Sequence, residues 1–86
     1  MDFDYRKLRG KIKEVFGTQD RFSKALGMGR VSLSRRLNNL LDFSNEEIYK
    51  SCMLLGIPTN EISLYFFKEK VQELERHNSL PEKKLA

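Results

Sequence analysis

The chain has 86 residues, enough for one small domain with a single core. Apolar residues make up 40% of it and charged residues 33%, a balance typical of a folded chain and not of a disordered one. One cysteine excludes an internal disulfide, and one histidine leaves no His/Cys set for zinc. The composition therefore predicts no metal and no cofactor.

The sequence contains no apolar run near the roughly 20 residues that a membrane-spanning helix needs. It also has no charged-then-apolar leader at its start. We therefore expect a cytoplasmic protein with no membrane partner. The last residues, Lys84-Leu85-Ala86, resemble the start of an expression-vector linker, so we expect no functional role for them.

Positive charge is concentrated in the first half of the chain. Residues 1–40 carry ten Lys/Arg against four Asp/Glu, a net of +6, and residues 41–86 carry six against eight, a net of −2. This asymmetry favours a surface that faces a polyanion, most simply nucleic acid. A solvated basic helix face explains the charge pattern equally well.

Apolar periodicity and capping residues predict an all-α fold of about five short helices, with no alternating strand pattern. Asp4 is expected to cap the first helix, and Ser44 with Glu47 to form a capping box at the fourth. The glycines at 17, 27 and 56 are expected to end helices. The predicted helices cover residues 5–16, 19–26, 30–38, 45–55 and 59–67, the last of which Val71 and Leu74 extend in one interpretation. We expect one domain over residues 1–76 and a polar tail over 77–86.

The second and third predicted helices are joined only by Gly27-Met28-Gly29. So short a turn forces a steep crossing in place of an antiparallel hairpin. The apolar spacing directs one set of side chains inward, namely Phe22, Leu26, Met28, Leu33 and Leu37. It leaves an outward ridge on the third helix, namely Arg30, Val31, Ser34 and Arg35.

The segment from Gln19 to Asn39 resembles the Cro/C1-type, or lambda-repressor-like, helix-turn-helix family. Residues 5–12 and 61–67 are similar to small phage-encoded Cro-like proteins, so the resemblance covers about residues 3–72. It implies a compact five-helix domain that binds double-stranded operator DNA, usually as a homodimer. It also implies a repressor of a phage lysis/lysogeny switch, acting in the bacterial host cell.

The resemblance also implies site residues. Base contacts fall to Arg30, Val31, Ser34 and Arg35, and phosphate contacts to Gln19 and Asn38. The physical chemistry of these residues agrees, because an arginine can pair with guanine in the major groove and a helix N-terminus attracts phosphate. Asn39, beside Asn38 at the end of the third helix, can donate to phosphate in the same way.

Two positions depart from the family pattern. Gly29 stands where the family favours Ser or Thr, so the third helix begins with a weaker cap. Arg36 stands where many members place an apolar residue, so we expect its stem to cover Leu33 and its head to reach an acid or a phosphate.

Two further functions remain open. One is a modulator or antirepressor that complexes a partner repressor through the second and third helices or through Tyr65-Phe66-Phe67. These three aromatics are read either as a dimer or partner surface or as core with a rim. The other is the antitoxin of a toxin pair. An enzyme is not expected, because Ser32 and Ser34 have no neighbouring base and no catalytic set is present.

Overall fold

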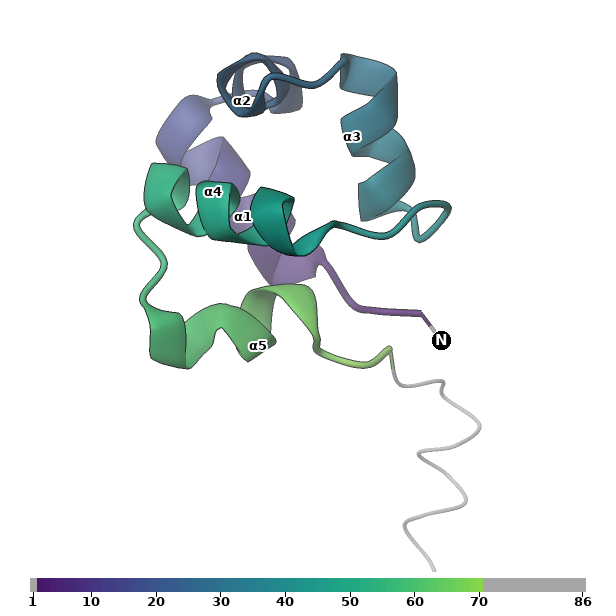
Figure 1. Ribbon diagram of the computed structural model, residues 1–86, viewed down its shortest axis with the longest axis vertical. Coiled ribbons are helices and arrows are strands. Elements are labelled where there is room, and N and C mark those ends of the chain that lie inside the picture. The colour runs from purple at the N-terminus through teal and green to yellow at the C-terminus, as the bar shows by residue number, and fades with distance from the viewer. Residues whose placement is uncertain (1, 71–86) are drawn as a thin grey trace, which may run out of the picture.

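The structure is a computed structural model that describes residues 2–70. Within that range it has five α-helices and one 3-10 turn (Figure 1). The elements are α1 (Arg6–Phe16), α2 (Gln19–Leu26), α3 (Arg30–Leu37), α4 (Asn45–Leu55), η1 (Thr59–Glu61) and α5 (Ile62–Phe66). The prediction of an all-α fold is confirmed, and the boundaries agree with it to within a residue or two.

The helix ends follow the capping residues in the sequence. The Thr18 hydroxyl accepts a hydrogen bond from the Arg21 N–H at the start of α2. At the start of α4, Ser44 and Glu47 form both bonds of the capping box. Gly27 and Gly56 adopt left-handed φ angles of 79° and 70°, where a Cβ atom is disfavoured, and they end α2 and α4.

Two predicted ends need correction. Tyr5, and not Asp4, is the N-cap of α1, so the helix begins at Arg6. The Asp4 carboxylate still accepts the Arg6 backbone N–H at 3.0 Å, so it bonds to the first residue of α1 from the position before the N-cap. The second correction concerns the end of α3, which lies at Leu37 and not at residue 38. Asn38 has left the helical region and is the C-cap.

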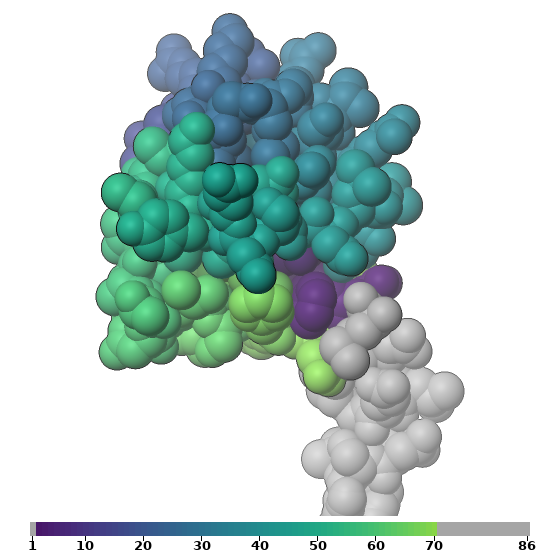
Figure 2. All heavy atoms as spheres, viewed as in Figure 1, coloured from purple at the N-terminus to yellow at the C-terminus, as the bar shows by residue number. Residues whose placement is uncertain are grey.

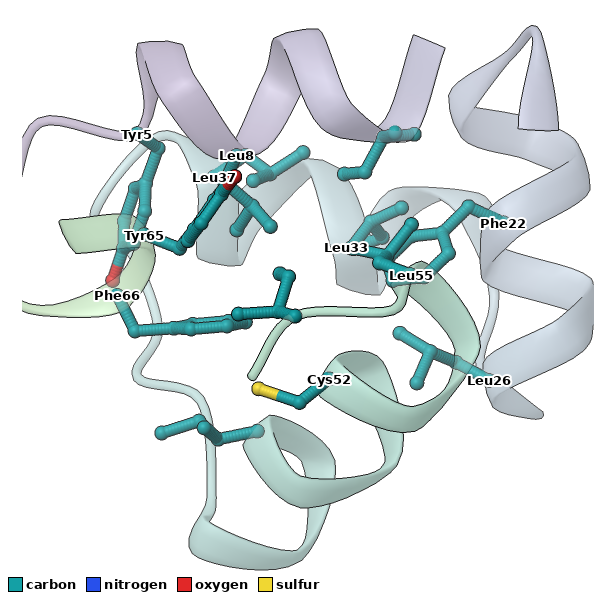
Figure 3. Packing of buried hydrophobic residues seen from close by; sticks show 13 residues of the cluster. Tyr5, Leu8, Phe22, Leu26, Leu33, Leu37, Cys52, Leu55, Tyr65 and Phe66 are labelled. Atoms are coloured by element: carbon teal, nitrogen blue, oxygen red, sulfur yellow. The ribbon is translucent and has the colours of Figure 1, made fainter. Parts of the chain in front are cut away.

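The core lies where the helices converge, and Figure 3 shows its side chains pointing toward one another from α1, α2, α3, α4 and α5. Phe22, Leu33 and Leu8 are fully buried and join the first three helices. Cys52 lies in the same cluster, where it acts as a small apolar residue. This core fixes α3 from its inner side and leaves the opposite side exposed.

Residues 2–4 form an extended segment, here called the strap, that lies before α1 and contacts distant parts of the chain. Phe3 pairs with Glu69 in an antiparallel bridge, and the Asp4 N–H donates to the Lys68 carbonyl at 2.7 Å. On its other side, the Phe3 N–H and C=O are both bonded to the Asn39 side chain, at 2.9 and 3.0 Å. The strap therefore lies between the end of α3 and residues 68–70.

The chain leaves the helical conformation after Phe66 and continues to Lys70 as an extended segment. The proposed helix extension through Val71 and Leu74 lies outside the described residues, as does the predicted tail over 77–86. The domain limit at residue 76 therefore stays a prediction.

Candidate interaction face on helix α3

The turn between α2 and α3 sets the direction of α3. The Met28 N–H donates to the Ser23 carbonyl at 3.0 Å, which folds the chain sharply at Gly27. Ser23 is buried beneath this turn, and its small side chain permits close approach. In Figure 1, α2 is seen nearly end-on while α3 runs across the view, so the steep crossing predicted from the three-residue turn is present.

Helix α3 presents the predicted ridge to solvent. Arg30, Val31 and Arg35 are exposed, with Val31 at 62%, and Ser34 is half-buried. Within residues 2–70, neither Arg30 nor Arg35 forms an ion pair or a side-chain hydrogen bond. The outward orientation predicted for Arg30, Val31 and Arg35 is therefore confirmed, and Ser34 is only partly exposed. The contact of all four residues with DNA bases stays a prediction.

Arg36 lies on the side of α3 that faces α4. Its guanidinium donates to both carboxylate oxygens of Glu47, at 2.9 and 3.2 Å, and to the Ser32 carbonyl at 2.9 Å. An acid or a phosphate was expected to bind the Arg36 guanidinium, and in the structure the partner is the acid Glu47. Arg36 therefore joins α3 to α4 and is not part of the exposed ridge.

The three residues predicted to contact phosphate lie in different surroundings. Gln19 is the first residue of α2 and is half-buried. The Asn38 amide donates to the Ser34 carbonyl at 2.9 Å and accepts from Arg9 Nη2 at 3.0 Å. Asn39 has a φ angle of 63° and uses its amide for the strap. The two asparagine side chains are thus already bonded within the domain, and their phosphate contacts stay a prediction.

Of the two interpretations of Tyr65, Phe66 and Phe67, core with a rim agrees with the structure, and a partner surface is wrong for the first two residues. Tyr65 and Phe66 are buried, with Phe66 at 1% exposure, and both point into the core in Figure 3. Phe67 follows the last residue of α5, turns away from the core and is 48% exposed. The physical reason is that α5 ends between Phe66 and Phe67, so the three rings do not share one helical surface.

Exposed aliphatic residues next to α3 were missed by the sequence reasoning. Leu40 is 71% exposed and Leu41 is also exposed, and both backbone N–H groups donate to the Arg35 carbonyl. The sequence signal for this exposed apolar surface was the pair Leu40-Leu41, which directly follows the two asparagines at the end of α3. They place apolar surface beside the cationic ridge.

Two classes of site are not found in the part of the chain that the structure describes. Residues 2–70 contain no group of three His, Cys, Asp or Glu side chains positioned to hold a metal ion. None of the helices in the same range is both long and apolar enough to cross a membrane. The exposed ridge on α3 is one candidate site in this part of the chain.

The fold and this ridge define a small all-α protein with a helix-turn-helix unit and an exposed cationic helix. The chain belongs to the DUF739 family, described as a protein family of unknown function, whose model matches residues 1–69.

Among solved structures, the chain is similar to the modulator of repression (MOR) of the temperate bacteriophage TP901-1 from Lactococcus lactis, determined in solution. The two sequences are 38% identical, and the match covers 84% of this chain and 97% of that one with a TM-score of 0.70. A comparison with curated proteins gives no match.

Proposed function

We propose that this chain is a phage modulator of repression that acts by binding a partner repressor protein. The similarity to a phage modulator of repression at 38% identity, over almost the whole of that protein, carries the proposal. Binding of this kind changes how much of the repressor is available to its operator. No catalytic step is part of the function.

The chemistry of the α3 ridge supports a protein partner. Arg30 and Arg35 provide two cations that the described domain leaves unpaired, and Val31 and Leu40 add exposed aliphatic surface beside them. Arginine with apolar contacts is typical of protein interfaces, where a carboxylate can accept two N–H bonds from one guanidinium. A phosphate backbone would satisfy the arginines but leave Leu40 without an apolar partner. We therefore propose that the partner presents carboxylates around an apolar contact.

The direct experiment measures complex formation with a purified phage repressor protein. The purified proteins are mixed and their affinity is determined by titration calorimetry, with the mass of the complex from light scattering. The double variant Arg30→Ala/Arg35→Ala should bind at least about tenfold more weakly, since each charged hydrogen-bonded contact contributes on the order of 1–3 kcal/mol. Lys13→Ala, an exposed cation on α1, is the matched control and should bind like the parent chain.

Operator binding by this chain alone is the second candidate. The outward position of Arg30, Ser34 and Arg35 on a short exposed helix supports it, because an α-helix fits the major groove and arginine pairs with guanine. A homodimer would place two such helices about 34 Å apart on a pseudo-palindromic site. Here the protein alone would shift a fragment of its own promoter region, and Arg35→Ala would weaken and relax that binding.

The two functions separate in one set of measurements. A stable repressor complex without a promoter shift at low salt supports the modulator. A promoter shift without a repressor complex overturns it in favour of a Cro-like repressor. The antitoxin alternative depends on the C-terminal stretch as the toxin-binding part, which lies largely outside the described residues, and it stays a prediction.

A further inference from the structure

Two pairs of cations from opposite ends of the chain line one hollow beside the strap. Arg6 and Arg9 are three residues apart on α1, and Lys68 and Lys70 are two apart in an extended segment, so each pair shares a face of its own element. The bridge between Phe3 and Glu69 brings the two elements together. Figure 2 shows this adjacency as the purple N-terminal residues beside the yellow-green ones near residue 70.

The hollow has a volume of about 630 Å³, and a second one of about 370 Å³ adjoins it. Asp4, Arg6 and Lys68 line both. Lys7 lines the second, with its ammonium 5.1 Å from the centre of the Tyr65 ring. The C-terminal end of α3 forms one wall of the larger hollow. The two hollows therefore make a continuous surface from α1 past the strap to the end of α3.

Positive charge outweighs negative charge on this surface. Its five cations face two carboxylates, those of Asp4 and Glu69. Asp4 is bound by Arg6 at 2.8 Å, and the hydrogen bonds from Arg6 hold the pKa of this carboxyl well below its usual range. Lys68 and Lys70 form no ion pair within residues 2–70. The net excess of three cations is therefore available to an anionic ligand.

The surface differs from the α3 ridge in having no exposed aliphatic side chain. The apolar residues that line the larger hollow are buried or half-buried, namely Phe3, Tyr5 and Leu37. A protein partner would find no apolar anchor there, whereas a nucleic-acid backbone is bound through charge alone. We propose that this surface binds the phosphate backbone of nucleic acid, independently of base sequence, as a second site beyond the proposed repressor-binding ridge.

The test measures binding of the full chain to a fluorescent duplex of random sequence by anisotropy, between 50 and 200 mM salt. The double variant Lys68→Glu/Lys70→Glu should bind at least about tenfold more weakly at low salt. Its plot of log affinity against log salt should be less steep by roughly 2, because each neutralised phosphate contributes about 0.9 to the slope. The matched control is Lys13→Glu/Lys24→Glu, which makes the same charge change on exposed residues away from the hollow. It should change the affinity less than about threefold.

Three results would overturn the proposal. The parent chain does not bind the duplex at 50 mM salt, the two charge-reversal variants lose affinity equally, or the Lys68/Lys70 variant loses the repressor complex and not the duplex. The last outcome assigns the surface to an acidic protein partner. Lys68 and Lys70 bond to the strap through backbone groups that the variants keep, so the variants should fold, and circular dichroism checks this. The milder variant Lys68→Gln/Lys70→Gln should show an intermediate loss. Repressor binding is measured separately with the Arg30 and Arg35 variants. The repressor-binding proposal and the nucleic-acid proposal can therefore fail independently of each other.

Discussion

Arg36 of α3 and Glu47 of α4 form a bidentate ion pair, with Nε–Oε1 and Nη2–Oε2 distances of 2.9 and 3.2 Å. The side chains are only 18% and 25% exposed. The same Glu47 carboxylate accepts the Ser44 N–H in the capping box. One side chain therefore starts α4 and also attaches it to α3, so the stability of the exposed helix depends on the charge of Glu47.

Glu47→Gln should lower the free energy of unfolding by about 1–2 kcal/mol at pH 7, because it removes the charge but leaves an oxygen to accept the Ser44 N–H. Burial raises the pKa of Glu47, but the hydrogen bonds from Arg36 and Ser44 outweigh it and the pKa lies below its ordinary value of 4.5. A carboxyl with a lowered folded pKa stabilises the protein above its unfolded pKa and loses this effect as pH falls.

The measurement is urea unfolding of the parent and the variant from pH 7 to pH 3. The difference between them should be full at pH 7 and should shrink below about pH 4.5. Glu46→Gln alters the exposed neighbour in the same first turn and should change stability by no more than a few tenths of a kcal/mol. A Glu47 effect that is constant with pH would show that the ion pair contributes no stability.

Ser51→Ala should raise the free energy of unfolding by about 1 kcal/mol. The Ser51 hydroxyl is fully buried in α4 and has no hydrogen-bond partner among the described residues. Removing an unsatisfied buried hydroxyl removes its desolvation cost, and alanine also favours a helix more than serine does. Thermal unfolding measures the change. Ser23→Ala is the control, because that buried hydroxyl donates to the Asp20 carbonyl at 2.7 Å and its loss should not stabilise. A destabilised Ser51 variant would contradict the expected gain.

Gly29→Ser should stabilise α3 by about 0.5 kcal/mol. Gly29 is the N-cap of α3, with φ at −72° and no side-chain cap bond, and a Cβ atom there meets nothing within 4 Å. A serine hydroxyl can accept one of the unpaired N–H groups of the first turn. Gly29→Ala adds the Cβ without the oxygen and should not stabilise α3. Gly27→Ala should instead cost about 1 kcal/mol, because its φ of 79° disfavours a side chain. Equal effects of serine and alanine at Gly29, in denaturant unfolding, would rule out the cap.

Phe66→Ala and Phe67→Ala should differ sharply in stability. Phe66 is 1% exposed and packs edge-on against Phe43, so its removal should cost about 3–5 kcal/mol. Phe67 is 48% exposed and contacts the strap through Phe3, so its removal should cost about 1 kcal/mol or less. Urea midpoints of the two variants provide the comparison. A large loss at Phe67 would indicate that this ring is buried in solution, for example against a second copy of the chain.

Local signals explain why most of the helices could be predicted. Thr18, Ser44 and the glycines that end α2 and α4 act within one helical turn, so their effect can be read from adjacent residues. The outward direction of Arg30 and Arg35 followed in the same way from the short turn and the buried Leu33 and Leu37.

The missed features depend on contacts between distant parts of the chain. The Asn39 amide is committed to Phe3, and Lys68 and Lys70 lie beside Arg6 and Arg9, because the strap crosses the domain. No pattern within one helix encodes such a crossing. The end of α5 is a local feature, but three adjacent aromatics do not indicate which of them begins the next segment.

The contacts of the strap set the order in which parts of the domain can assemble during synthesis. Phe3 leaves the ribosome before α1, can meet Asn39 only once α3 has emerged, and can meet Glu69 only after α5 has emerged. The helices can pack earlier, because their contacts are nearer in sequence. The strap is thus synthesised before the five helices but is bonded on both of its sides only after all five have emerged.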